Sequence, residues 1–179
     1  MSEGRRVLSL PGWQNSGPGH WQSRWEALYG DERVEQADWH WPRRGDWMAR
    51  LDEVLQADTR PAVLVAHSLG CHLVAAWAAH TRHRHRVVGA LLVAPPDIER
   101  EDMPPQVSTW RRAVLESLPF PATLIHSEDD PYCSAARAQQ FATAWHAQAH
   151  GIGRAGHINA DSGLGDWPAG RQHLQGWLA

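Results

Sequence analysis

Near the middle of the chain, residues 62–79 read AVLVAHSLGCHLVAAWAA, a short apolar run, a serine and a longer apolar run. The run 62–66 has the length of a strand and is apolar at every position, which is typical of a strand covered on both faces of a parallel sheet. The run 69–79 is almost wholly apolar and long enough for a buried helix. Residues 66–70, which join the two runs, therefore predict a tight strand-to-helix turn with Ser68 at its centre.

The turn matches the small-x-Ser-x-Gly pattern of a nucleophile elbow. The residues two before and two after the serine must be small, because the strand and the helix would otherwise collide, and Ala66 and Gly70 meet this requirement. Such a turn strains the backbone of Ser68 so that its hydroxyl stands clear of the sheet. The N–H of Leu69, at the positive end of the following helix, can then donate to an oxyanion. The same pattern also occurs in Ser-Gly turns without a catalytic role.

Apolar runs of strand length alternate with amphipathic runs along the rest of the chain. Strands are predicted over 7–10, 33–39, 62–66, 87–94, 122–126 and 150–154, and helices over 21–29, from the N-cap Asp46, and over 69–79, 107–118, 135–147 and 174–178. About six β-then-α units without a repeat or a linker predict a single α/β domain over residues 1–179, with a parallel sheet and helices on both faces. The segment 97–105 is too short for a large lid.

Ligands of open parallel sheets bind at the carboxyl ends of the strands, so the residues that follow each strand are the candidates for a site. The predicted strand 122–126 is followed by two adjacent carboxylates, Asp129 and Asp130. Asp130 is the favoured one, because the residue before a proline is held extended, and Asp129 remains the alternative. The predicted strand 150–154 is followed by His157, on a loop that starts with glycine.

The chain order of these residues is that of the α/β-hydrolases, Ser, then Asp, then His. Each of the three is a common surface residue when taken alone, but Ser68, Asp130 and His157 all fall at predicted strand ends. Together they predict a minimal α/β-hydrolase fold with a catalytic triad. His157 would take the proton of the Ser68 hydroxyl, and Asp130 would orient the imidazole.

The loop after the first strand is expected to supply the second oxyanion donor, as in this fold class. Gly12 lets the backbone turn toward the serine, and the N–H of Trp13 is the first candidate, with that of Gln14 as the second. The mouth of the pocket could be lined by polar and aromatic side chains in or after this loop and by one farther along the chain, namely Gln14, His20, Trp21 and Trp110.

Composition excludes several classes of function. All 17 basic residues are arginine, so Schiff-base chemistry and a Ser-Lys dyad are excluded, and the formal net charge of −3 gives no reason to expect nucleic acid or an anionic membrane as a partner. The two cysteines, Cys71 and Cys133, do not make a disulfide framework. No apolar run approaches the roughly 18 residues of a membrane span, and no secretory leader is present, so a cytoplasmic location is expected.

A histidine-rich stretch, residues 80–85, raises the alternative of metal binding. His83 and His85 would lie on opposite faces of a strand, and the arginines between the histidines repel cations. No metal is therefore predicted, and acyl transfer through a serine needs no cofactor.

The chain also resembles a known family, the small serine hydrolases of the YdeN type, which are relatives of retinoblastoma-binding protein nine. The matching segments are residues 10–12 (LPG), 19–26 (GHWQSRWE), 66–70 (AHSLG), 129–131 (DDP) and 156–159 (GHIN). The resemblance implies a minimal α/β-hydrolase domain without a large lid, a triad of Ser68, Asp130 and His157, and activity on small carboxylic esters. Ala66 stands where many hydrolases carry glycine.

Two other functions stay open at this point. The fold could serve as a non-catalytic interaction module, since fold does not dictate function. The same triad could also cleave thioesters or amides, or transfer acyl groups. A haloalkane-type reaction is disfavoured, because it would need a carboxylate at position 68. The expected partner is a small ester-like molecule, with neither nucleic acid nor a membrane, and the sequence identifies no protein partner.

Overall fold

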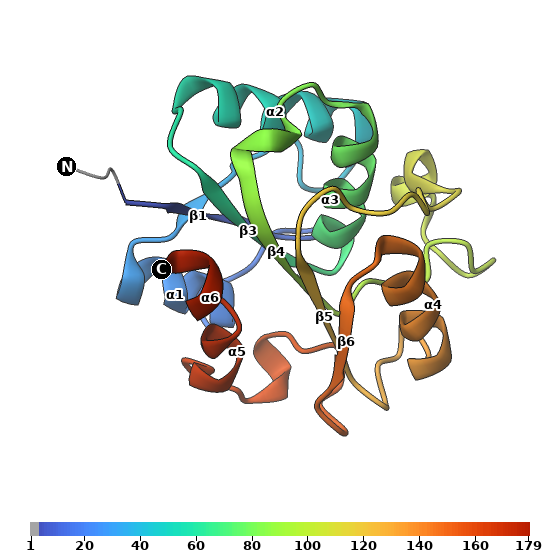
Figure 1. Ribbon diagram of the computed structural model, residues 1–179. Coiled ribbons are helices and arrows are strands. Elements are labelled where there is room, and N and C mark those ends of the chain that lie inside the picture. Colours follow the sequence, from blue (N-terminus) through green and yellow to red (C-terminus); the bar gives the residue numbers. More distant parts are fainter. Residues whose placement is uncertain (1–3) are drawn as a thin grey trace.

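The protein is built on a parallel sheet of six strands, shown by a computed structural model that describes residues 4–179 (Figure 1). The strand order is β2-β1-β3-β4-β5-β6, and every neighbouring pair is parallel. The strands are β1 (Arg6–Leu10), β2 (Glu32–Arg33), β3 (Ala62–His67), β4 (Val87–Val93), β5 (Ala122–His126) and β6 (Gln148–Gly151). The predicted fold class is confirmed, with β3 and β4 in the middle of the sheet.

Helices cover both faces of the sheet. Helices α2, α3 and α4 lie on one face, and α1, α5 and α6 on the other (Figure 1). Their bounds are α1 (Trp21–Tyr29), α2 (Arg44–Ala57), α3 (Leu69–His80), α4 (Ala135–Trp145), α5 (Pro168–Gln172) and α6 (Gln175–Leu178). The segment between β4 and β5 contains only a short 3-10 helix, Pro105–Trp110, so within residues 4–179 no large lid covers the carboxyl ends of the strands.

The central strand shows why the run 62–66 is apolar throughout. Leu64 and Ala66 pack into the apolar core under α2, α3 and α4, whereas Val63 and Val65 pack into the core under α1, α5 and α6. All four side chains are at most 1% exposed. A polar residue on either face of β3 would lose its contacts with water without gaining a partner.

The second strand is shorter than predicted. β2 has two residues, and the alternation over 33–39 does not continue as a strand. The N–H of Val34 still donates to Ser9 O at 2.9 Å, but the Asp38 carboxylate then accepts the backbone N–H groups of the two residues at positions 40 and 41. This local turn competes successfully with pairing to β1.

The predicted helix over 107–118 is also wrong. The chain forms the 3-10 helix Pro105–Trp110 and then an irregular segment, in which Arg112 has a φ of +62° that no right-handed helix accommodates. α2 begins at Arg44, so Asp46 lies in its first turn rather than at its N-cap. The end of the chain forms two short helices, α5 and α6, instead of one.

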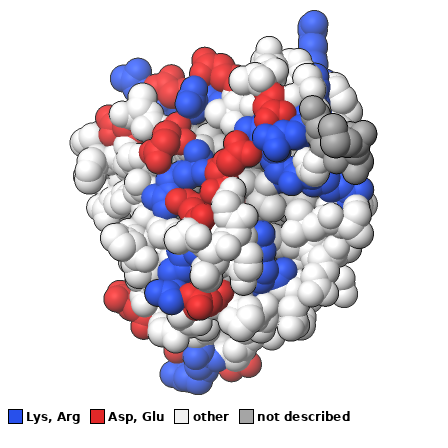
Figure 2. Space-filling model, turned by 90° about the vertical axis from the view of Figure 1, so that its left-hand side faces the viewer, with Lys and Arg blue, Asp and Glu red and all other residues white. Residues whose placement is uncertain are grey.

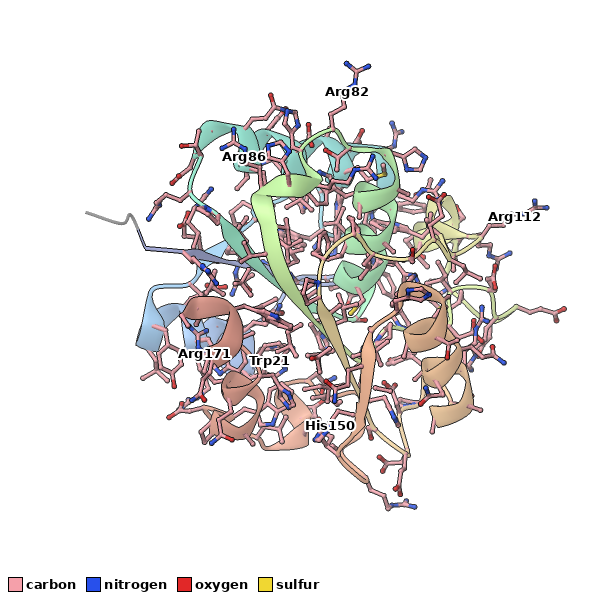
Figure 3. All side chains as sticks on the ribbon, viewed as in Figure 1. Trp21, Arg82, Arg86, Arg112, His150 and Arg171 are labelled. Atoms are coloured by element: carbon pink, nitrogen blue, oxygen red, sulfur yellow. The ribbon has the colours of Figure 1, made fainter. Side chains whose placement is uncertain are left out.

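Charges of both signs are interspersed on the surface. The face in Figure 2 carries arginines among aspartates and glutamates, without a large patch of one sign. Arg82 and Arg112 project away from the fold (Figure 3). Within residues 4–179, no helix combines the length and the apolar character needed to cross a bilayer.

A buried histidine anchors the segment that leaves β4. His72, on α3, contacts Pro96 O through Nε2 at 2.8 Å, and its ring packs edge-on against Phe141 and Trp145. Burial lowers the pKa of His72 to about 4, so the ring is neutral at neutral pH and Nε2–H donates to the carbonyl.

His72 makes the stability of the fold sensitive to acid. The unfolded chain takes up a proton near pH 6.5, whereas folded His72 stays neutral down to about pH 4, so the free energy of unfolding falls as the pH drops through this window. The titration of His72 alone is expected to lower the free energy of unfolding by about 2 kcal/mol between pH 7 and pH 5. Urea unfolding at a series of pH values measures this. In His72→Gln, which keeps a donor but does not titrate, the pH-dependent loss should shrink by that amount; an unchanged pH dependence would contradict the assignment.

Candidate active site

The turn between β3 and α3 holds Ser68 in a strained conformation, with φ 56° and ψ −123°. The backbone approaches so closely here that a Cβ on Gly70 would collide with the carbonyl oxygen of Leu10. A Cβ on Gly12 would lie 2.9 Å from the Cβ of Ser68 and 3.1 Å from the N of Leu69. The small residues are therefore required by the contact between the turn and the loop after β1.

Three side chains from separate loops meet at this turn. The Ser68 hydroxyl lies 2.9 Å from Nε2 of His157, and Nδ1 of His157 lies 3.1 Å and 3.0 Å from the two carboxylate oxygens of Asp130. With the imidazole proton on Nδ1, His157 donates to Asp130 and accepts from Ser68. The side chains of His157 and Asp130 are 10% and 3% exposed, so water competes little for these hydrogen bonds.

The two adjacent carboxylates after β5 have different partners. Asp130 faces His157 and also accepts the N–H of Tyr132. Asp129 instead accepts the Ser127 hydroxyl and the N–H of Gly156, both at 2.9 Å. These two hydrogen bonds, with the Gly156 N–H contributing most, hold the pKa of Asp129 below its ordinary value. Asp129 thus ties the loop after β5 to the loop that carries the histidine.

The histidine loop is fixed by two buried donors. The indole N–H of Trp21 donates to Ile158 O at 2.8 Å, and Nε2 of His67 lies 2.9 Å from His157 O. Gly156 and Ile158 have positive φ values of 58° and 50°, so this loop turns sharply on both sides of the histidine. The carbonyl contacts hold the strained loop in place.

Two neutral imidazoles, those of His67 and His20, lie in a row next to the His157 ring. The ring centroids of His67 and His157 are 4.9 Å apart, and those of His20 and His67 are 4.6 Å apart. Burial, reinforced by the neighbouring His20 and His157, lowers the pKa of His67 well below its ordinary value. Burial, then Arg33 and His157, lowers the pKa of His20 to about 4. At neutral pH, neither ring places a positive charge beside His157.

Two residues that line the pocket with Ser68, Leu69 and Trp13, have backbone N–H groups free to donate. Leu69 is the first residue of α3, so its N–H has no acceptor within the helix. The N–H of Trp13 meets no acceptor within the described part of the chain, and Gly12 brings this loop against Ser68. The N–H of Gln14 donates to Trp39 O at 3.0 Å, so the second candidate for the oxyanion donor is already occupied.

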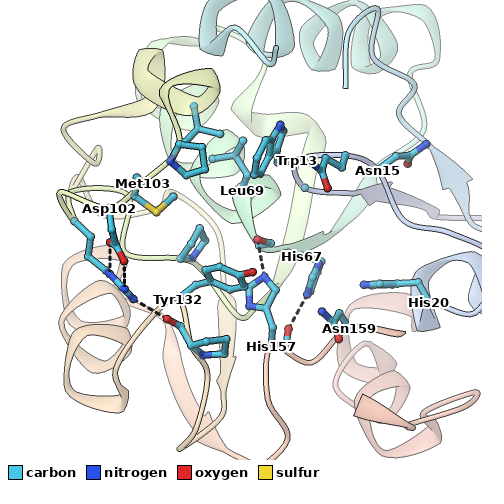
Figure 4. A pocket seen from close by; sticks show the side chains of 18 residues that line it. Trp13, Asn15, His20, His67, Leu69, Asp102, Met103, Tyr132, His157 and Asn159 are labelled. Carbon is cyan, nitrogen blue, oxygen red and sulfur yellow. Dashed lines mark hydrogen bonds and ion pairs between the residues drawn. The ribbon is translucent and has the colours of Figure 1, made fainter. Parts of the chain in front are cut away.

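A pocket of about 560 Å³ opens over Ser68 (Figure 4). Around Ser68, the wall of the pocket comes from the loop after β1, the segment after β4, and the two loops that carry Asp130 and His157. The apolar part of this wall comprises Gly12, Trp13, Leu69, Pro96, Met103, Pro104, Val107, Pro131 and Tyr132, and the polar part Gln14, Asn15, His20, His67, Arg100, Asp102, His157 and Asn159.

The structure places Gln14 and His20 in the lining of the pocket, and the two predicted tryptophans, Trp21 and Trp110, outside it. Trp21 and Trp110 are each 1% exposed and lie in the two cores. The indole N–H of Trp21, the first residue of α1, donates to Ile158 O at 2.8 Å, and that of Trp110 donates to Pro42 O at 2.8 Å. Large aromatic rings with one N–H are stable in the core when a carbonyl accepts that N–H.

Several pocket residues were not predicted. His67 lies within the predicted elbow, and its imidazole side chain was the one sequence feature that could have marked it as a site residue. Tyr132 packs edge-on against the His157 ring with centroids 4.7 Å apart. Met103 and Asn159 reach the pocket from irregular segments, where no periodic pattern marks an inward-facing side chain.

The histidine-rich stretch serves a structural contact. His83 Nδ1 lies 3.1 Å from the Asp52 carboxylate, which also accepts the Thr81 hydroxyl and the Trp77 indole N–H. Within residues 4–179, no three or more His, Cys, Asp or Glu side chains are arranged to hold a metal ion.

Comparison with known proteins places this geometry in a wider group. A protein described as a YdeN-like hydrolase from Pectobacterium atrosepticum is 30% identical, with a TM-score of 0.84 over 96% of this chain and 89% of that chain. The ydeN gene product of Bacillus subtilis is 19% identical, with a TM-score of 0.75 over 97% and 98% of the two chains. The esterase RhEst1 from Rhodococcus is 16% identical, with a TM-score of 0.70 over 100% and 93%.

The last two similarities concern the fold alone. No curated protein sequence matches the chain. The model of the serine hydrolase family matches residues 7–176, which include the sheet except for the first residue of β1, and every loop of the pocket. With this match and the similarity to the Pectobacterium protein, the chain belongs to the serine hydrolase family, among its YdeN-like members.

Proposed function

We propose that the chain hydrolyses small carboxylic esters through an acyl-enzyme formed on Ser68. The observation that carries this proposal is the continuous hydrogen-bond path from the Ser68 hydroxyl through His157 to the buried Asp130 carboxylate. A serine is a weak nucleophile unless a base accepts its proton during attack, and this path supplies the base and the group that orients it.

In the first half of the reaction, the Ser68 oxygen attacks the acyl carbon and its proton passes to Nε2 of His157. The N–H groups of Leu69 and Trp13 donate to the oxyanion of the tetrahedral intermediate. When the bond to the alcohol oxygen breaks, His157 returns the proton to that oxygen and the alcohol leaves. Asp130 stabilises the imidazolium that exists between these two transfers.

In the second half, water replaces the alcohol. His157 takes a proton from the water as its oxygen attacks the acyl carbon, and the same two N–H groups receive the oxyanion. Breaking the bond to the Ser68 oxygen releases the carboxylic acid, and the serine regains its proton from His157. Every proton is returned, so the chain's own residues complete the cycle.

Pocket size and known relatives favour small esters as substrates. The cavity of about 560 Å³ lies within the ordinary range for small-molecule sites, and the segment after β4 that contributes to its wall is short, with one 3-10 helix. Among proteins of the same fold, RhEst1 is described as an esterase and CesB of Bacillus subtilis as a carboxylesterase. The assembled triad weighs against a purely non-catalytic interaction module.

A matched set of substrates tests the proposal against thioester and amide cleavage. Butyrate is offered as an ethyl ester, an ethyl thioester and an ethyl amide, and released butyrate is measured. We expect kcat/KM to be highest for the ester, with a butyryl adduct on Ser68 in the intact mass of rapidly quenched enzyme. Faster thioester or amide cleavage would reassign the substrate class. Turnover of the ester without a butyryl adduct on Ser68 would contradict the covalent route.

A further inference from the structure

The two ends of the pocket differ in chemistry. On one side of Ser68 lie Leu69 and Met103 with other apolar side chains of the segment after β4, and next to Met103 the Asp102 carboxylate is paired with Arg100 (Figure 4). On the other side lie His20 and Asn159, close to His67 (Figure 4). A substrate that fills both ends therefore has one apolar part and one part that meets polar side chains.

The Asn159 side chain offers a donor to the pocket. Its Oδ1 accepts the N–H of Asp161 at 3.1 Å, which determines which way the amide faces. The NH₂ group of Asn159 has no acceptor within residues 4–179, and Figure 4 shows it directed toward His67. The Asn159 side chain also accepts the backbone N–H of Ser162 in the capping box of the 3-10 helix Ala160–Ser162, so both lone pairs of its oxygen are engaged. The partly exposed amide can therefore donate to a ligand.

The His20 ring offers a second donor behind the first. Its Nδ1 accepts the N–H of Gln22 at 3.1 Å, where His20 caps α1. The neutral ring therefore carries its proton on Nε2. This nitrogen is buried, in a residue that is 4% exposed, and meets no acceptor among the described residues.

A buried donor without an acceptor destabilises the folded protein by about 1–3 kcal/mol. A ligand that brings an acceptor to the His20 N–H would therefore remove this cost. Neither His20 nor Asn159 has an acceptor left for a ligand donor. This end lies beside His157, which must reach the leaving oxygen to protonate it. The alcohol part of an ester therefore extends toward Asn159 and His20, and its acyl part toward Leu69 and Met103.

We propose that the chain prefers esters whose alcohol part carries a second carbonyl oxygen, held by the N–H groups of Asn159 and His20, and whose acyl part is apolar. This inference rests on the proposed function, because it assigns the substrate class of the same site. Asn159 and His20 are specificity-determining residues in this account and take no part in the proton transfers.

The test compares two esters of the same shape, acetonyl butyrate and methallyl butyrate, which differ by a carbonyl oxygen in place of a methylene group. The measured quantity is the ratio of the two kcat/KM values in each variant. Dividing this ratio by that of wild type cancels the difference in intrinsic reactivity between the two esters. Asn159→Asp keeps the acceptor for Asp161 and replaces the donor by an acceptor. His20→Asn keeps a good N-cap for α1 and removes the ring donor.

We expect the acetonyl preference to fall about tenfold in Asn159→Asp and about fivefold in His20→Asn. Gln139→Glu is the control for an added charge: Gln139 is exposed and does not line the pocket, so its ratio should stay that of wild type. Unchanged ratios in both test variants would overturn this inference alone. Wild type that hydrolyses neither ester would overturn the proposed function as well.

Discussion

Replacing Ser68 by alanine is expected to lower kcat/KM for a short-chain ester by roughly 10⁴- to 10⁶-fold. Without the hydroxyl there is no nucleophile for the acyl-enzyme route, and only transition-state binding by the backbone donors remains. The substitution removes one oxygen and one hydrogen bond, to His157, so the fold should persist. Release of butyrate and the urea unfolding curve measure the two effects separately.

Ser117→Ala provides the matched control for this loss. Ser117 is exposed and does not line the pocket, so its variant should hydrolyse the ester at the wild-type rate. If Ser68→Ala were folded and retained a rate within about tenfold of wild type, a serine nucleophile at this position would be ruled out.

Replacing Asp130 by asparagine is expected to lower kcat/KM by about 10⁴-fold, because the amide can hold the imidazole in the wrong tautomer and cannot stabilise its charged form. The neighbouring carboxylate gives an internal comparison. In Asp129→Asn, the remaining oxygen can still accept from the Ser127 hydroxyl and the Gly156 N–H, so the loss should stay within about tenfold.

The same ester assay distinguishes these two aspartates. Both carboxylate oxygens of Asp130 lie within hydrogen-bond distance of the His157 ring, and its side chain is 3% exposed. The Asp129 side chain is 35% exposed and accepts instead from Ser127 and Gly156. A larger loss in Asp129→Asn than in Asp130→Asn would contradict the assigned order of the hydrogen-bond path.

Where one periodic pattern governed a segment, the sequence was a good guide to the fold. The run 62–66 and the helix over 69–79 agree with β3 and α3 to within one residue at each end, because apolar side chains at every position leave only a doubly covered strand and a buried helix as solutions. The predictions failed where a local turn or the backbone conformation of one residue decided the path of the chain. The Asp38 turn shortened β2, and the left-handed Arg112 ended the predicted helix over 107–118.

The candidate site was also predictable from the sequence only in part. The chain order and the strand ends pointed to Ser68, Asp130 and His157, whose side chains lie in hydrogen-bond contact. Their catalytic roles remain predictions. The contacts of Trp21 and His67 with the histidine loop join segments about 90 to 140 residues apart, and no local pattern encodes such a contact.

Labelling with a fluorophosphonate probe, which reacts with a serine only when a working base and oxyanion donors activate it, examines this activation without knowledge of the natural substrate. Wild type is compared with Ser68→Ala and with Ser117→Ala, each shown to be folded. We expect wild type and Ser117→Ala to be labelled once, on Ser68, and Ser68→Ala to stay unlabelled. Folded wild type that resists the probe, or a Ser68→Ala variant labelled as strongly as wild type, would contradict an activated nucleophile at Ser68.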